Sequence, residues 1–156
     1  MNLKQSLIEN HSIKLHQSAR SWKEAIKIGT DMLVKSGAVE ERYYEEIINK
    51  IKEIGPYIIL APGLAMPHAR PEDGVIRTAF ALVTLSEPIY FDGSDDPIDV
   101  LLTLAGKDAE QHMQGLVEIT QILDDPSSEL GIDLDKVRVC KSEDDVYKMI
   151  DAVLTS

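Results

Sequence analysis

The stretch Ala61–Pro71 reads Ala-Pro-Gly-Leu-Ala-Met-Pro-His-Ala-Arg-Pro, so that one histidine, His68, stands among three prolines and a glycine. Each proline fixes its own φ angle and biases the residue before it toward extended backbone, which argues against a helix here. The apolar run immediately upstream, residues 57–60 (Tyr-Ile-Ile-Leu), predicts a buried strand. We therefore expect a strand that runs into a stiff loop, which holds the imidazole of His68 at a set position.

A histidine held in this way has two interpretations. An imidazole is neutral or charged near neutral pH, and in its neutral form it is a nucleophile with two nitrogens that can do different jobs. His68 is therefore a candidate catalytic residue. A histidine in a surface turn would give the same local sequence, so the choice between the two depends on the rest of the chain.

Length and composition are those of an ordinary globular protein. The 156 residues suffice for one domain, 1–156, with a substantial core, and the apolar and charged shares are 44% and 28%. No apolar run approaches the roughly 20 residues that a membrane span needs. The first residues lack the apolar region of a signal peptide, and Cys140 is the single cysteine. We therefore expect a cytoplasmic protein without internal disulfides.

The charge of the chain restricts its partners. The formal net charge is −11, which argues against a nucleic-acid binder because a phosphate backbone demands a basic face. The same charge disfavours an anionic membrane surface. A protein partner with a basic patch fits it better.

Apolar spacing and capping residues predict strands that alternate with helices, which is typical of a three-layer α/β sandwich around one sheet. Tyr43 and Tyr44 lie on the inner face of a predicted helix, where core packing is their expected role. Residues 137–140 fit either a short strand or part of a turn. Helices are expected over residues 3–10, 22–36, 40–54, 109–124 and 143–154, and strands over residues 12–16, 57–60, 78–85, 88–91 and 98–104.

Two histidines follow predicted core strands. His68 follows residues 57–60, and His112 follows residues 98–104. Ligands usually bind at the carboxyl ends of strands in α/β sheets, so the two imidazoles would face one pocket if these strands were neighbours. His112 also falls in the first turn of a helix capped by Asp108, where exposed N–H groups and the helix dipole attract anions. That is a suitable place for a phosphoryl group; an ordinary first-turn residue is the alternative interpretation.

The other reactive groups are isolated in the sequence. His11 and His16 have no clustered carboxylates, whereas a zinc site needs three or four ligands. Cys140 has no neighbouring histidine and is interpreted as a small buried apolar group. The chain contains no nucleophile elbow, phosphate-cradling glycine loop or dinucleotide fingerprint. We therefore expect no metal and no cofactor, and a phosphoryl group would have to come from a protein.

On these residues the chain resembles a known family. Residues 63–70, Gly-Leu-Ala-Met-Pro-His-Ala-Arg, resemble the signature around the phosphorylated histidine in the mannitol/fructose class of enzyme IIA, part of the bacterial phosphoenolpyruvate-dependent sugar phosphotransferase system (PTS). Three longer segments look most like the L-ascorbate-specific enzyme IIA. They are residues 55–75, which surround this signature, residues 96–101 and residues 3–33. The resemblance covers essentially the whole chain in order.

The resemblance implies a fold, a reaction and partners. The fold would be a mixed, mostly parallel sheet of about five strands with helices on both faces. His68 would accept a phosphoryl group from the phosphocarrier protein HPr as a tele-phosphohistidine and pass it to a cysteine of enzyme IIB, which is linked to the membrane enzyme IIC. His112 would contact the phosphoryl group without becoming phosphorylated. The sequence itself shows neither which imidazole nitrogen attacks nor whether the protein is a monomer or a homodimer.

One position departs from the family pattern. Mannitol-type relatives carry an active-site arginine near the end of the helix before the signature, whereas residues 49–53 here read Asn-Lys-Ile-Lys-Glu. Lys52 lies about where that arginine should be, but a lysine is a point charge that cannot make a bidentate fork. Arg70, two residues after His68, has that geometry and is the other candidate for stabilising the phosphoryl group.

Two further hypotheses compete with sugar transport. A regulatory phosphoacceptor, like the nitrogen-type enzyme IIA, would use the same chemistry for a different purpose. In a binding module, His68 would merely line a pocket for a small molecule. Phosphorylation of His68 separates the last hypothesis from the first two.

Overall fold

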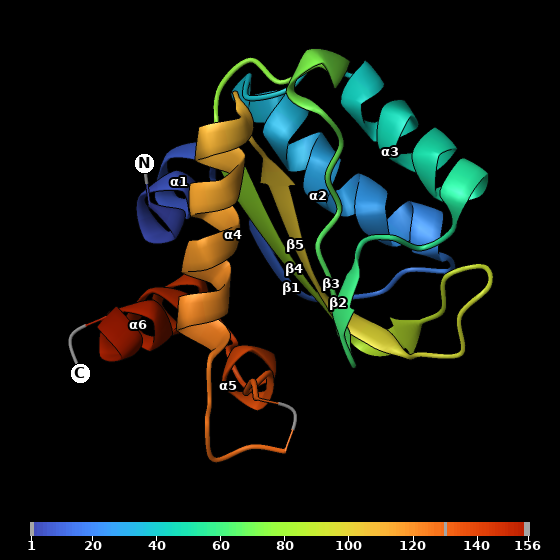
Figure 1. Ribbon diagram of the computed structural model, residues 1–156. Helices are drawn as coiled ribbons and strands as arrows, with labels where there is room; N and C mark the ends of the chain where they lie inside the picture. Colours follow the sequence, from blue (N-terminus) through green and yellow to red (C-terminus); the bar gives the residue numbers. More distant parts are fainter. Residues whose placement is uncertain (1, 130, 155–156) are drawn as a thin grey trace.

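The central strands carry apolar side chains on both faces, and this explains why helices cover the sheet on either side. In strand β4 (Ala79–Ile89), Ala81 and Val83 join one buried cluster, whereas Phe80 and Leu82 join another. Successive side chains of a strand point to opposite faces, so a strand that is apolar at every position needs cover on both. The computed structural model, which describes residues 2–129 and 131–154, shows this arrangement (Figure 1).

The other strands are β1 (Ile13–Gln17), β2 (Ile59–Ala61), β3 (Leu64–Ala65) and β5 (Ile98–Ala105). The order across the five-stranded sheet is β1-β4-β5-β3-β2. The pairs β1·β4 and β3·β5 are parallel, and the pairs β4·β5 and β2·β3 are antiparallel. A mixed sheet of five strands with flanking helices confirms the predicted α/β class.

Two layers of helices enclose this sheet (Figure 1). One face is covered by α2 (Trp22–Ser36) and α3 (Arg42–Ile54), whose buried side chains form one core cluster with the sheet. The helices that contribute to the second cluster, on the opposite face, are α1 (Leu3–Asn10), α4 (Ala109–Leu123), α5 (Asp135–Arg138) and α6 (Glu143–Leu154).

The predicted helix caps are present. The Ser21 side chain accepts a hydrogen bond from the Glu24 N–H at the start of α2, and Gly37 ends that helix with φ +83°. The Asp108 side chain accepts a hydrogen bond from the Gln111 N–H at the start of α4. Each cap satisfies a backbone group that has no partner within the helix, so the cap places the helix end.

The prediction of a buried strand over residues 57–60 is wrong. Tyr57 and Ile58 form a turn, and β2 begins at Ile59 as the edge strand of the sheet, with Leu60 42% exposed. The chain then turns at Pro62 and Gly63 into β3, so a short hairpin precedes His68. A four-residue apolar run does not by itself fix where a strand begins, and here the first two residues form a turn, with Ile58 buried, while the last two belong to β2.

Two smaller expectations also need correction. The separate strand expected over 88–91 is the end of β4, which runs without interruption to Ile89. The ambiguous residues 137–140 are neither strand nor simple turn, because α5 includes Val137 and Arg138. Arg138 forms a bidentate ion pair with Asp99 of β5 at 2.8 and 2.9 Å, a tertiary contact that local sequence does not reveal.

Within the described part of the chain, the helices are all too short or too polar to cross a lipid bilayer.

Candidate functional site

The two candidate histidines meet because β3 and β5 are parallel neighbours. His68 lies in the loop that follows β3, and His112 lies in the first turn of α4, which follows β5. The centroids of the two imidazole rings are 5.1 Å apart, with an angle of 53° between the ring planes. The expectation that neighbouring strands would bring these imidazoles together is fulfilled, although the strand before His68 is β3 rather than residues 57–60.

The hydrogen bond of one ring nitrogen sets the tautomer of His68. Nδ1 of His68 lies 2.7 Å from the carbonyl oxygen of Met66. A carbonyl oxygen can only accept, so Nδ1 carries the proton and donates it. In the neutral ring, the free lone pair is then on Nε2, the tele nitrogen.

Tyr57 holds the loop at His68. Its hydroxyl donates a hydrogen bond to the carbonyl oxygen of His68 itself, and its ring meets the imidazole edge-on with centroids 5.1 Å apart. Burial raises the pKa of Tyr57 to about 12, so the hydroxyl keeps its proton and remains a donor near neutral pH. The residue predicted to belong to a strand therefore supports the candidate nucleophile.

Both imidazoles are biased toward the neutral form. Burial lowers the pKa of His68, against the opposing effect of the hydrogen bond to Met66, and the charges of His112 and Lys50 lower it further. Burial also lowers the pKa of His112. A neutral His68 at pH 7 has the lone pair that a nucleophile requires.

A glycine allows the second histidine to approach. A side-chain carbon added at Gly106, just after β5, would lie 2.6 Å from Cβ of His112. The end of the strand therefore presses against the first turn of α4, and a larger residue would move the helix. This close approach helps to place the His112 ring beside His68.

The structure separates the two lysines at the end of α3. Nζ of Lys50 lies 5.7 Å from the centroid of the Tyr57 ring, and its charge acts on His68. Lys52 is exposed and lies beside Lys23. The contact between the two ammonium groups lowers the pKa of Lys52. Lys52, one of the two candidate cations named from the sequence, is therefore less well placed than Lys50.

Arg70 belongs to the same region, but its guanidinium already has partners. Its Nε lies 3.4 Å from a carboxylate oxygen of Asp73 and 3.5 Å from one of Glu72. Arg70, Asp73 and Lys50 line a hollow of about 280 Å³ beside α3. Neither His68 nor His112 lines this hollow, and Arg70 would have to leave its carboxylate partners to meet an anion on His68.

Helical spacing contained the signal for Lys50. Lys50 follows Tyr43 by seven residues, which is two turns, so both lie on the same face of α3. The Tyr43 hydroxyl accepts a hydrogen bond from the N–H of Ala69, next to His68. Lys52 is two residues further on, roughly 200° around the helix. The Tyr43 ring is buried in the core, as expected, but the expectation of core packing did not include the hydrogen bonds of its hydroxyl group.

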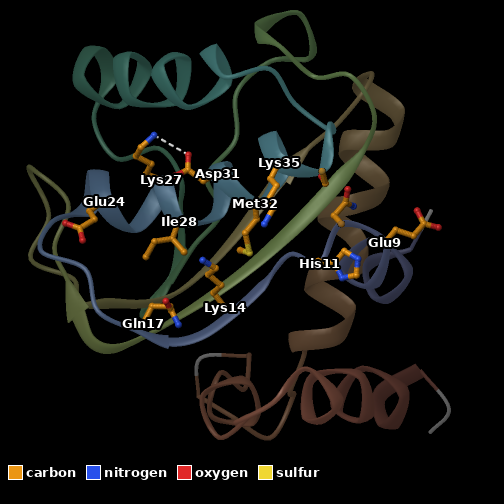
Figure 2. A pocket seen from close by; sticks show the side chains of 12 residues that line it. Glu9, His11, Lys14, Gln17, Glu24, Lys27, Ile28, Asp31, Met32 and Lys35 are labelled. Atoms are coloured by element: carbon orange, nitrogen blue, oxygen red, sulfur yellow. Dashed lines mark hydrogen bonds and ion pairs between the residues drawn. The ribbon is translucent and has the colours of Figure 1, made fainter.

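The remaining histidines lie elsewhere. Nε2 of His16 is 2.8 Å from the carbonyl oxygen of Cys140. His11 ends α1 in the left-handed region, with φ 49°, and lines a separate hollow of about 590 Å³ along β1 and α2 (Figure 2). Lysines and carboxylates alternate around that hollow, and Lys27 pairs with Asp31 at 3.2 Å. Neither His68 nor His112 lines it.

The site offers general features of group transfer without a metal-ligand cluster. Among residues 2–129 and 131–154, no three His, Cys, Asp or Glu side chains converge as metal ligands would. The arrangement contains a tethered imidazole with a free Nε2, a second imidazole beside it and a nearby ammonium group. These groups suit attack on an electrophile whose charged oxygens need positioned donors.

Comparison with known sequences gives a family over nearly the whole chain. Residues 6–153 match the family described as "Phosphoenolpyruvate-dependent sugar phosphotransferase system, EIIA 2". The ascorbate-specific PTS system EIIA component of Escherichia coli (strain K12) is 45% identical over 153 residues, which are 97% of this chain and 96% of that protein.

Solved structures agree with the sequence matches. A crystal structure described as PTS IIA (PtxA) from Streptococcus mutans has a TM-score of 0.88 and 43% identity, covering 100% of this chain and 97% of that one. The complex of mannitol enzyme IIA with phosphorylated mannitol enzyme IIB from Escherichia coli contains a chain with a TM-score of 0.75 and 26% identity, covering 90% of this chain and 94% of that one.

Proposed function

The chain belongs to the EIIA 2 family of the phosphoenolpyruvate-dependent sugar phosphotransferase system, and we propose that it carries a phosphoryl group on Nε2 of His68 between HPr and an enzyme IIB. The observation that supports this role most directly is the Nδ1–Met66 hydrogen bond, because it leaves Nε2 free beside His112. In this proposal the protein is cytoplasmic, and the membrane enzyme IIC takes part in sugar transport downstream of enzyme IIB.

In the proposed reaction, His68 is first a nucleophile and then a leaving group. The Nε2 lone pair attacks the phosphorus of phosphohistidine on HPr, and the P–N bond of the donor breaks with its electron pair returning to the donor imidazole. A cysteine thiolate of enzyme IIB then attacks the same phosphorus, and the bond to Nε2 breaks. The proton stays on Nδ1 throughout and is donated in a hydrogen bond to the Met66 carbonyl oxygen, which offsets the positive charge of the substituted ring.

His112 and a cation stabilise the transferred group in this mechanism. In the transition state the phosphorus lies in line between the entering and leaving nitrogen or sulfur atoms, and negative charge is spread over the three equatorial phosphoryl oxygens, where positioned donors are most effective. His112 is one donor, since its ring lies against that of His68. Lys50 supplies positive charge from α3, and Arg70 is the second candidate.

L-Ascorbate is the proposed carbohydrate of the system. The support is the similarity to the Escherichia coli ascorbate-specific component across nearly the whole of both chains. The alternative is a regulatory phosphoacceptor of the nitrogen type. The two differ in the protein that receives the phosphoryl group.

Reconstitution of the relay tests the proposal. The protein is incubated with phosphoenolpyruvate, enzyme I and HPr, and then with purified enzyme IIB proteins of ascorbate, mannitol and fructose type. We expect one acid-labile phosphate on His68 and fastest transfer to the ascorbate-type enzyme IIB. Absence of phosphate would refute both phosphocarrier roles, and phosphate that reaches none of the enzyme IIB proteins would favour the regulatory role.

Replacement of each cation by methionine identifies the one that acts on the phosphoryl group. Methionine keeps much of the lysine stem but removes the charge. We expect Lys50→Met to slow phosphoryl transfer about tenfold, which corresponds to roughly 1.4 kcal/mol, and Lys52→Met to leave the rate unchanged. Stopped-flow transfer from phospho-HPr measures both. A larger loss in Arg70→Met than in Lys50→Met would instead assign the role to Arg70.

A further inference from the structure

The hydroxyl of Tyr43 joins the two segments that carry the candidate histidines. Tyr43 is fully buried at 0% exposure, and its oxygen accepts a hydrogen bond from the N–H of Ala69 at 3.0 Å. The same hydroxyl donates to the carbonyl oxygen of Leu104 at 3.0 Å. Ala69 follows His68 directly, and Leu104 lies near the end of β5.

Leu104 also forms a hydrogen bond with Pro67, the residue that precedes His68. Its N–H donates to the carbonyl oxygen of Pro67 at 3.0 Å. Pro67 and Ala69, the two neighbours of His68, are thus fixed to one residue of β5, directly in the first case and through Tyr43 in the second.

Leu104 positions the second histidine as well. A side-chain carbon added at Gly115 of α4 would lie 2.8 Å from Cδ1 of Leu104, so this helix packs directly on the leucine. Two residues after Leu104, Gly106 presses against His112. A displacement of Leu104 relative to the loop would therefore change the separation of the two imidazoles.

We propose that Tyr43 is a positioning residue that sets the separation of His68 and His112, an inference that rests on the proposed phosphoryl transfer. Its ring only packs, whereas its hydroxyl holds the loop and the end of β5 in register. Misplacement of reacting groups by about 1 Å can slow a reaction by two orders of magnitude, so loss of this one oxygen slows transfer without changing either imidazole.

The neighbouring tyrosine provides a matched control. Tyr44 lies on the same helix, and its hydroxyl donates to the carbonyl oxygen of Lys23 at 3.3 Å, away from the histidines. Tyr43→Phe and Tyr44→Phe therefore remove the same atom from adjacent positions. Ile47→Val, one turn further along the buried face of α3, weakens the core without touching the hydroxyl network.

Phosphoryl transfer from phospho-HPr is measured for the three variants at several HPr concentrations. We expect Tyr43→Phe to lower kcat about tenfold with an unchanged KM, because the surface that meets HPr is intact. Tyr44→Phe and Ile47→Val are expected to keep the wild-type kcat. An unchanged kcat in Tyr43→Phe, a change confined to KM, or an equal loss in Ile47→Val would each overturn the inference.

Ring spectra of the unphosphorylated protein give a readout that does not depend on transfer. In ¹⁵N-labelled protein, we expect the His68 and His112 ring resonances to shift in Tyr43→Phe and to stay in place in Tyr44→Phe. Unchanged rings in Tyr43→Phe would contradict the positioning role. If the wild-type protein accepted no phosphoryl group, the proposed function would fail, while these spectra would still decide whether Tyr43 positions the two rings.

Discussion

His68→Ala is expected to accept no phosphoryl group from phospho-HPr. Alanine removes the atom that forms the covalent bond in the proposed mechanism, in which the neighbouring His112 contacts the group and does not replace the nucleophile. Loss of a covalent nucleophile generally costs several orders of magnitude, and we expect at least about a thousandfold here. Mass spectrometry of the intact protein under alkaline conditions, which preserve phosphohistidine, measures the result.

The design needs variants that separate chemistry from folding. His68→Gln keeps a polar side chain that can bond the Met66 carbonyl, so it retains the loop while lacking the nucleophile. His16→Ala is the matched control, because its ring also bonds a backbone carbonyl, that of Cys140, outside the site. We expect full phosphorylation of His16→Ala and none of His68→Gln. Stoichiometric phosphate on either His68 variant would refute the site assignment.

His112→Ala is expected to accept the phosphoryl group but to pass it on about a hundredfold more slowly. The nucleophile remains, whereas one of the donors that offset charge on the transferred oxygens is lost, and removal of a single such donor typically costs this much. The measurement is the decay of phosphorylated protein after addition of excess enzyme IIB in a rapid-quench apparatus.

A second substitution distinguishes the donor from the bulk of the ring. His112→Gln retains an N–H donor on a side chain that still fits beside Gly106, so it should recover part of the onward rate. We expect the order wild type, His112→Gln, His112→Ala. An onward rate in His112→Ala equal to that of the wild type would show that His112 does not act on the phosphoryl group.

Local sequence was sufficient for the elements whose signals are local. The apolar residues of β4, and those of β5 from Val100 onward, alternate between two clusters, and the Ser21 and Asp108 caps are short-range hydrogen bonds. These features depend on residues within one turn or one strand, so the helix starts and the two central strands were predictable.

The structure of residues 57–60 depends on contacts beyond these four residues. Their apolar character predicted a buried strand. Instead, the Tyr57 hydroxyl bonds the His68 carbonyl, and only Ile59–Ala61 form a strand, which is short and lies at the edge of the sheet. The apolar character of a side chain predicts that it is buried, but not which element of the fold buries it. The choice between sheet and loop was made by the hairpin that inserts β3 between β2 and β5.

Lys50 was not among the candidate cations named from the sequence, which were Arg70 and Lys52. Lys52 lies about where the family pattern has its arginine, whereas the orientation of α3 places Lys50 over the ring of Tyr57, close enough for its charge to act on His68. A helix face is predictable from spacing, but its orientation relative to a distant loop is not. The Tyr43 hydroxyl illustrates the same limit, since its two partners are 26 and 61 residues away.

The sequence by itself determined the candidate reactive group and its setting: an imidazole at residue 68 in a proline-stiffened loop, and a second imidazole at residue 112 in a capped helix start. Proline geometry and helix capping act over a few residues, so they can be read from neighbours. Only the tertiary structure brought the centroids of the two rings to 5.1 Å, aimed the Nδ1–H of His68 at the Met66 carbonyl and set Lys50 over the ring of Tyr57. These contacts depend on the parallel pairing of β3 with β5, which joins segments far apart in the chain.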